Sequence, residues 1–320
     1  MIGGISSASI LSQTITALNN EQATMSDLTM QLSTGIKSND LTRYSPYEAS
    51  SLLSSKGLVT KYESYKAAIQ SVQPRLSVYS SSLAALGKTA NTVQGLINGA
   101  QNFTSAIDTG LPQQLASALD QASYYLNQKV GERYIYAGVR YQTKPVADLR
   151  ALPLPPSGTF PVVSPNLPPY DTQAPGTDAN AFTQDRVAID DNLQMDYGIP
   201  STSTGIQNLI QGLRYAYAAT QDSGNYDAYM AQAKQYLAAS TTGIRSLEAK
   251  VAGDQKVLTQ TFKDHNASIA LLNGQIDQIQ NVNINEVATK ISFYQTQLQA
   301  SYAATGKLAS LSILNYLPNI

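Results

Sequence analysis

Apolar side chains recur at alternating steps of three and four residues over most of this chain. In the clearest series, twelve successive positions between Tyr62 and Ala100 follow this spacing. An average spacing of 3.5 residues keeps one stripe of a helix facing a partner helix, which is the pattern of a coiled coil. Similar series occur near both chain ends and after residue 225. The pattern therefore predicts a mainly α protein, a long coiled-coil helical rod built from both chain ends.

The two terminal helices are predicted to pair with each other. The first is expected over residues 5–34, where Gly35 can end it in the left-handed conformation. The last begins after Asn283, whose side chain and Glu286 form a capping-box pattern. Only three of the residues 283–317 are charged, so we expect other protein to cover several sides of this helix. The candidate assembly interface comprises Leu11, Ile15, Leu18, Met25, Leu32, Ile284, Val287, Ile291, Tyr294, Leu298, Leu308 and Leu311.

The internal helices have recognisable starts and stops. Ser45-Pro46 with Glu48 predicts the N-terminus of a second helix. Pro74 lies inside this helix and is expected to kink or break it, because proline removes an intrahelical hydrogen bond. A third helix is expected from near Pro112 to Gly131, and a short strand or extended arm at 134–138.

A proline-rich stretch interrupts the helical pattern. Ten of the fourteen prolines lie between residues 145 and 200. Two alternating segments flank Asp191-Asn192 there, a pair typical of a β-hairpin turn. The predicted domains are an N-terminal coiled-coil helix (1–44) that pairs with a C-terminal one (281–320), a helical rod (45–144 and 201–280), and a β-containing insert (145–200) at the far end of the rod.

Composition narrows the classes of function. The net charge of −1 gives no indication of nucleic-acid or anionic-membrane binding. Charged residues make up 13% of the chain, about half the usual share. Without cysteine, disulfides, zinc–thiolate sites and thiol catalysis are excluded. No apolar run approaches the roughly 20 residues of a membrane-spanning helix, and the first basic residue, Lys37, comes too late for a cleaved secretory signal.

Candidate chemistry is sparse. The one histidine, His265, lies on a helical stripe, which favours a core or interhelical hydrogen-bonding role over catalysis, since no second histidine or cysteine could complete a site. Asp185, Asp190, Asp191 and Asp196 lack the spacing of a calcium-binding loop, and turn chemistry explains the central two. We therefore expect no catalytic residues, no metal and no cofactor.

Three short motifs resemble those of the flagellin superfamily. The first is Gln31-Leu-Ser-Thr-Gly-Ile-Lys37, which is similar to the turn that ends the first helix of this superfamily. Tyr134-Ile-Tyr-Ala-Gly138 with Thr143-Lys-Pro145, and the ending Leu308-Ala-Ser-Leu-Ser-Ile-Leu-Asn-Tyr-Leu317, resemble hook–filament junction proteins, also called hook-associated protein 3. The chain departs from the superfamily at residues 40–46 and 87–92, so the immune-receptor contact of some flagellins is not carried over.

This resemblance implies a function in the bacterial flagellum. It implies a non-enzymatic structural subunit at the hook–filament junction that assembles through its terminal helices and connects a hook-associated protein to the flagellin filament. The implied partners are identical subunits, a neighbouring hook-associated protein, flagellin, the flagellar type III export apparatus and an export chaperone. The implied location is extracellular, reached without a cleaved signal peptide. Two alternatives stay open: a divergent flagellin that forms the filament itself, and a secreted coiled-coil adhesin.

Overall fold

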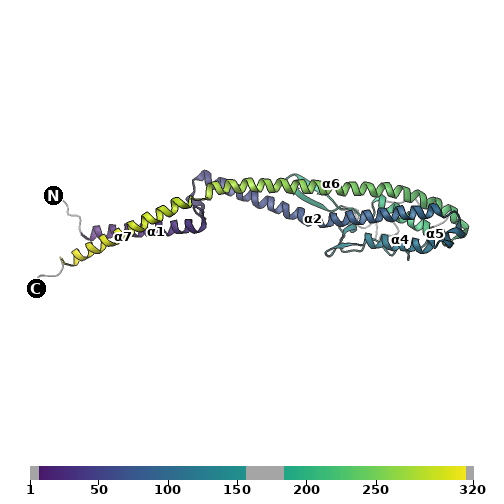
Figure 1. The fold of residues 1–320 in the computed structure, drawn as a ribbon, viewed down its shortest axis with the longest axis horizontal. Coiled ribbons are helices and arrows are strands. Elements are labelled where there is room, and N and C mark those ends of the chain that lie inside the picture. Colours follow the sequence, from purple (N-terminus) through teal and green to yellow (C-terminus); the bar gives the residue numbers. More distant parts are fainter. Residues whose placement is uncertain (1–6, 156–183, 315–320) are drawn as a thin grey trace. The chain divides into compact units, whose positions relative to one another are not determined.

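Long α-helices dominate the structure, a computed structural model that describes residues 7–155 and 184–314 (Figure 1). For residues 7–11 and 308–314 only the backbone is described. The described strands form two small antiparallel sheets of two strands each. This confirms the predicted fold class, mainly α with a small β-containing insert. The chain divides into two compact units, Met1–Thr60 with Ser268–Ile320, and Lys61–Ala267.

The first unit contains both terminal helices. Helix α1 (Ser7–Thr34) ends at Gly35, which has a φ of 72° and donates its N–H to the carbonyl of Gln31. Helix α7 (Ile284–Leu314) begins after Asn283, whose side-chain oxygen accepts from two N–H groups of the first turn. The unit also contains the short 3₁₀ helix η1 (Leu41–Arg43). Two long helices begin or end in it: α2 (Pro46–Gly99) up to residue 60, and α6 (Tyr226–Gln280) from residue 268.

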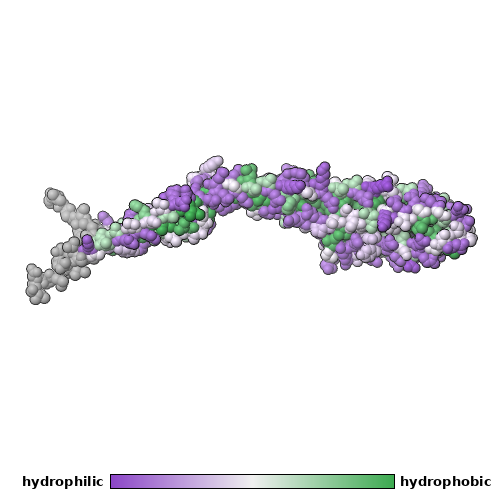
Figure 2. All heavy atoms as spheres, in the orientation of Figure 1, coloured by the Kyte–Doolittle hydropathy of each residue, from purple (hydrophilic) through white to green (hydrophobic). Residues whose placement is uncertain are grey.

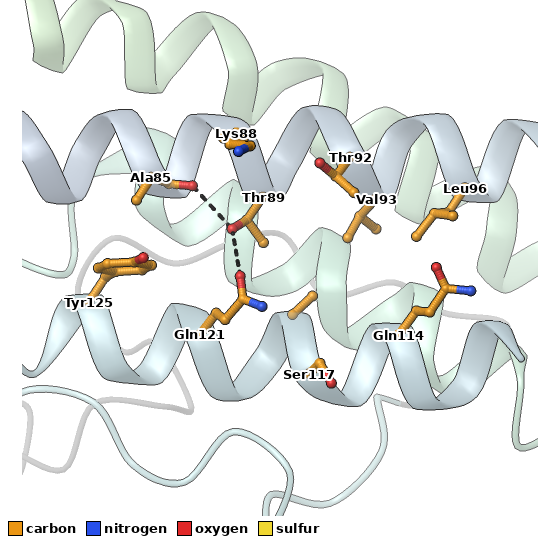
Figure 3. Close-up of a pocket in the computed structure, with 11 residues that line it drawn as sticks. Ala85, Lys88, Thr89, Thr92, Val93, Leu96, Gln114, Ser117, Gln121 and Tyr125 are labelled. Carbon is orange, nitrogen blue, oxygen red and sulfur yellow. Dashed lines mark hydrogen bonds between the residues drawn. The ribbon is translucent and has the colours of Figure 1, made fainter.

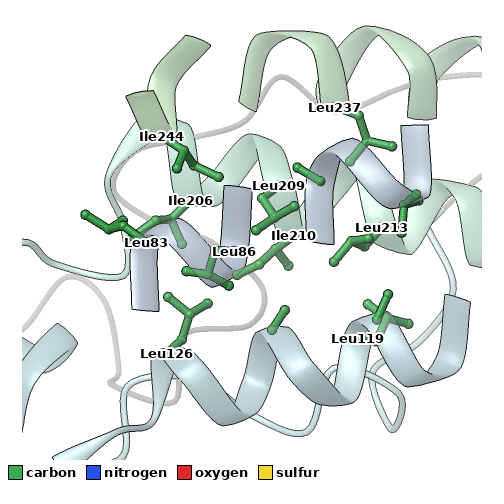
Figure 4. Packing of buried hydrophobic residues seen from close by; sticks show 14 of the residues in the cluster. Leu83, Leu86, Leu119, Leu126, Ile206, Leu209, Ile210, Leu213, Leu237 and Ile244 are labelled. Atoms are coloured by element: carbon green, nitrogen blue, oxygen red, sulfur yellow. The ribbon is translucent and has the colours of Figure 1, made fainter. Parts of the chain in front are cut away.

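The second unit has a continuous hydrophobic core between helices. Its main helices are α2 from residue 61, α4 (Leu111–Leu126), α5 (Thr204–Ala219) and α6 to residue 267, connected partly through α3 (Phe103–Asp108) and η3 (Ser223–Asn225). Leucine and isoleucine side chains from all four converge (Figure 4). Ten members of the predicted α2 series are buried: Ile69, Val72, Leu76, Tyr79, Leu83, Leu86, Ala90, Val93, Ile97 and Ala100.

Pro74 does not break α2. The helix runs without interruption from Pro46 to Gly99. A proline in a helix interior costs about 3 kcal/mol. Val72 and Leu76 on either side of Pro74 are 2% and 0% exposed, and burying side chains of this size contributes about 1.5–3 kcal/mol each. Packing on both sides therefore offsets the lost hydrogen bond, so of the two expected outcomes, a kink or a break, the break does not occur.

Helices α5 and α6 approach each other closely at glycine. A Cβ atom added to Gly205 would lie 2.6 Å from the carbonyl carbon of Gly243, and one added to Gly243 would lie 2.5 Å from the Cα of Gly205. Two turns further along α5, a Cβ atom added to Gly212 would lie 2.7 Å from the Leu237 side chain. The missing side chains thus permit two backbones to touch, which positions α5 within the core.

The two small sheets connect the helices of the second unit. Strands β1 (Lys129–Val130) and β2 (Arg133–Tyr134) precede a 3₁₀ turn, η2 (Ile135–Ala137), so the strand or extended arm expected over 134–138 is largely a turn. Burial explains this difference, because the turn places Tyr136 at 0% exposure, with its ring edge-on to Tyr79. Strands β3 (Arg186–Asp190) and β4 (Leu193–Asp196) form the predicted hairpin around Asp191-Asn192.

We predict that Gly243→Ala destabilises the second unit. The added methyl group would press on backbone atoms that cannot move aside, and such overpacking costs about 1–3 kcal/mol. Part of this is offset by the better helix propensity of alanine, about 1 kcal/mol. Urea unfolding should show a net loss of up to about 2 kcal/mol. Gly253→Ala in the same helix is the matched control, because its Cβ meets nothing within 4 Å; equal stability of the two variants would contradict the close approach.

Candidate assembly surface of the terminal helices

Helices α1 and α7 pack side by side in antiparallel directions. At one end, the N–H of Val282 donates to the carbonyl of Gly35, and the N–H of Lys37 donates to the carbonyl of Gln280. Further along, Gln22 of α1 contacts Tyr302 of α7. The buried apolar residues between the helices are Leu28 at 8% exposure, Val287 at 4% and Leu298 at 8%. We call this contact the terminal seam.

A polar layer interrupts the terminal seam at Glu21. One oxygen of its carboxylate accepts from the Gln297 amide at 2.6 Å, and the other accepts from the Ser301 hydroxyl at 3.2 Å. The amide of Gln22, next in the chain, donates to the Tyr302 hydroxyl. The polar layer therefore consists of Glu21 and Gln22 from α1 with Gln297, Ser301 and Tyr302 from α7.

The structure places the predicted interface residues in three groups. Val287 and Leu298 are buried in the terminal seam, and Leu18, Met25, Ile291 and Tyr294 are half-buried along it. Ile15, Leu32 and Ile284 are 45%, 39% and 54% exposed. The side chains of Leu11, Leu308 and Leu311 lie outside the described part of the chain. Whether these residues contact other subunits stays a prediction.

Sequence reasoning missed two members of the terminal seam, Glu21 and Leu28. Steps of three and four residues through the predicted α1 residues Leu18, Met25 and Leu32 lead to Gln22 and Thr29, each one residue beyond Glu21 and Leu28. Both patterns share Leu18 and Met25, so the shared positions hid the difference. Leu28 is the apolar residue at the observed spacing. Its position in the sequence could have identified the correct stripe.

Apolar side chains also point away from the terminal seam. Met30 of α1 is 54% exposed and lies about half a turn from Leu28, on the side of its helix away from α7. Phe293 of α7 is 64% exposed and flanks the seam, one turn before Gln297, which contacts Glu21. Ile284 and Tyr302, nine residues to either side of Phe293 and thus two and a half turns away, are more than half exposed beside the seam. Figure 2 shows hydrophobic residues on the surface over this helix pair. The pair is therefore apolar on several sides.

In the second unit, the hairpin is fastened to the helices by polar groups. The ring of His265, 2% exposed, stacks on Tyr62 and Tyr65 with centroids 5.0 and 5.7 Å away, and its Nε2 lies 2.7 Å from the Ile189 carbonyl oxygen. Lys250 donates to the Asp196 carbonyl. His265 is thus buried, as expected for a core role, but its hydrogen bond joins a helix to the hairpin and not to another helix. The hairpin lies along α2 and α6 at these residues and not at their far end, and residues 156–183 of the predicted insert lie outside the described part of the chain.

The acidic residues near the hairpin face cations of the chain. Asp185 lies 3.5 Å from Arg133, Asp196 lies 2.6 Å from Arg186, and Asp191 pairs with Lys61. Hydrogen bonds, first from Lys61 and then from Tyr65, lower the pKa of Asp191, and Arg186 lowers the pKa of Asp196. Among the described residues no group of three side chains could hold a metal ion.

A surface hollow of about 400 Å³ lies between α2 and α4 (Figure 3). Small and polar side chains line it, and the Thr89 hydroxyl donates to the Ala85 carbonyl across one turn. Lys88 is the charged residue of the lining, beside amides, hydroxyls and aliphatic groups.

In the comparison with known proteins, similarity is found to a solved structure and not to a family model or a curated sequence. No model of a protein family matches the chain, and no curated protein sequence matches it. A solved structure from Vibrio parahaemolyticus, provisionally described as a flagellar hook-associated protein, is similar with a TM-score of 0.57. The identity is 13%, and the match covers 75% of this chain and 100% of that one. The two proteins therefore share a fold.

We predict that the two faces of α1 respond differently to a charge. Leu28→Asp places a carboxylate in the terminal seam, so it should unpair α1 from α7. Met30→Asp, on the exposed side, should change stability by no more than about 0.5 kcal/mol. Hydrogen exchange of the full chain should show faster exchange over residues 284–307 for Leu28→Asp alone. Equal protection in both variants would contradict the observed seam.

Proposed function

We propose that this chain is a structural, non-enzymatic subunit of the bacterial flagellum at the hook–filament junction. It assembles with identical subunits through α1 and α7 and connects a hook-associated protein to the flagellin filament. The flagellar export apparatus carries it out of the cell, with an export chaperone as a further partner. Two kinds of support are independent: the motifs near residues 31–37, 134–145 and 308–317, and the fold shared with a provisionally described hook-associated protein.

The observation that carries the proposal is the exposed apolar surface of the α1–α7 pair. A helix pair that worked alone in water would bury its apolar stripe and present charged outer faces. Here Met30 is exposed on the outer side of α1, Phe293 on one flank of α7, and Ile284 and Tyr302 on the other flank. Residues on opposite flanks of one helix cannot both be covered by a single neighbour. The arrangement therefore supports contacts with several subunits, as in a tube of packed helices.

The charges of the pair fit the same conclusion. Arg43 pairs with Asp27, and Lys290 lies 2.6 Å from Glu286. Each of these charges has its counter-ion within one chain, so neither pair needs a partner subunit to neutralise it. No helix within the described ranges is long and apolar enough to span a bilayer.

A divergent flagellin would use the same terminal surface, so the choice between junction and filament rests on other features. The chain carries Thr143-Lys-Pro145 after its aromatic–glycine stretch, an element that resembles junction proteins. This element favours the junction role, and the two roles differ in what a cell loses with the protein.

We predict that Leu298→Asp combined with Leu308→Asp blocks incorporation into flagella. Leu298 is 8% exposed in the terminal seam, so a charge there should prevent helix pairing and assembly. Circular dichroism should still show a folded region 62–280. Asp191→Ala is the control: it removes the Lys61 contact in the second unit and should leave incorporation intact. Normal incorporation of the double variant would contradict the role of the terminal helices.

We predict that cells lacking this chain make hooks without filaments. A junction subunit is needed for flagellin to attach, whereas hook assembly precedes it. Electron microscopy of the deletion strain, with the wild-type chain restored as control, measures this. Hooks carrying filaments of altered structure would instead indicate a flagellin, and normal flagella would indicate a function elsewhere, such as an adhesin.

A further inference from the structure

A second hollow continues the one between α2 and α4. Its volume is about 720 Å³, and Val78 of α2 and the later residues of α4 line it. Val78 precedes Ala85 and Thr92 of the first hollow at seven-residue steps, so both hollows lie on the same side of α2. On α4 the lining residues also follow one stripe: Gln114, Ser117, Gln121 and Tyr124. We call the two hollows together the α2–α4 trough.

Two tyrosines stand where the hollows meet. Tyr124 lines the second hollow and is 66% exposed, and Tyr125 lines the first and is half-buried. Their rings meet edge-on, with centroids 5.3 Å apart and planes at 71°. An exposed tyrosine can stack on an apolar face of a ligand, and it loses little entropy because it has two χ angles. The middle of the trough therefore offers an aromatic platform.

Side-chain amides of the trough have hydrogen-bonding capacity to spare. Gln121 faces Thr89 across the first hollow (Figure 3), but the Thr89 hydroxyl has one hydrogen and donates it to the Ala85 carbonyl at 3.1 Å. The 3.5 Å contact of Thr89 with Gln121 is therefore weak. In the second hollow the side-chain oxygen of Gln128 is buried without a hydrogen-bond partner in the described part of the chain. An unpaired buried acceptor costs about 1–3 kcal/mol, which a ligand hydroxyl would offset.

This lining disfavours other classes of ligand. Phosphate groups are typically bound by arginine clusters, and none of the described lining residues is an arginine. The lysines share the trough with Asp120 and Asp148. A helical peptide needs an apolar groove and an extended one a sheet edge, whereas both walls here are helices with amides and hydroxyls. Sugars match the trough, because their hydroxyls both donate and accept and their C–H faces stack on aromatic rings.

We propose that the α2–α4 trough binds an oligosaccharide strand. Tyr124 stacks on a sugar ring, and the amides of Gln121 and Gln128 hydrogen-bond sugar hydroxyls on either side of it. Both walls belong to the second unit, so a single folded chain contains the site, and the inference does not rest on the flagellar role. In an assembly of many copies, weak single sites would act together.

The test measures binding of the full chain to an array of neutral and acidic oligosaccharides on a common linker. The wild type should bind a set of glycans that share a sugar residue. Tyr124→Ala removes the platform and Gln121→Leu removes an amide, and each should weaken binding to that set at least about fivefold. Both side chains are exposed, so neither variant should unfold.

Matched controls separate the trough from general surface effects. Tyr47→Ala removes a tyrosine that is 84% exposed in the first unit, and Gln113→Leu removes an exposed glutamine of α4 outside the lining. Both should leave binding within about twofold of the wild type. In methyl NMR spectra, the bound glycan should shift Val78 and Leu96, which line the two hollows, and leave Leu237 of the core in place.

Three outcomes would overturn the proposal. The first is an array on which no glycan is bound. The second is an equal loss of binding in Tyr47→Ala and Tyr124→Ala, or NMR shifts confined to residues outside the trough. The third is binding to a printed set of peptides in place of glycans, which would identify the trough as a protein contact.

Discussion

The constraint on which this structure depends is that two helices alone cannot bury their apolar surface. Each helix covers only the stripe along which it touches the other, and everything else faces outward. In the first unit Leu28, Val287 and Leu298 are buried between α1 and α7, while Met30 and Phe293 stay more than half exposed. Ordering a residue costs about 1–2 kcal/mol of backbone entropy, so a thin helix pair gains most from further neighbours.

The second unit solves the same problem within one chain. Four helices surround its core, and α5 contributes residues on nearly every side. Gly205 and Gly243 allow the backbones of α5 and α6 to touch. Tyrosines Tyr79 and Tyr136 are fully buried, and burial raises the pKa of both phenols well above its usual range. The core of this unit is thus formed by its own helices.

Polar groups in this protein position segments relative to one another more than they stabilise the fold. The Glu21 carboxylate, the His265 ring and the Asp191 carboxylate each hold one element against another at a defined level. An exposed ion pair such as that of Asp191 with Lys61 contributes about 1 kcal/mol or less, and a neutral hydrogen bond about 0.5–1.5 kcal/mol. Apolar burial therefore provides most of the stability, and the hydrogen-bonded polar groups fix the level at which segments meet. A chain with only 13% charged residues can make such choices at few positions.

Local rules of chain geometry let the sequence alone determine the helices, their caps and the hairpin. Gly35, Asn283 and the pair Asp191-Asn192 act through their own backbone and nearest neighbours. The helix ends and the hairpin turn can therefore be predicted from short stretches of sequence. Tertiary structure alone decided which side of α1 meets α7, because a stripe through Glu21 and Leu28 and one through Gln22 and Thr29 both contain Leu18 and Met25. It also decided that the hairpin lies against His265 and that Tyr136 turns inward, since contacts between residues far apart in the chain determine both.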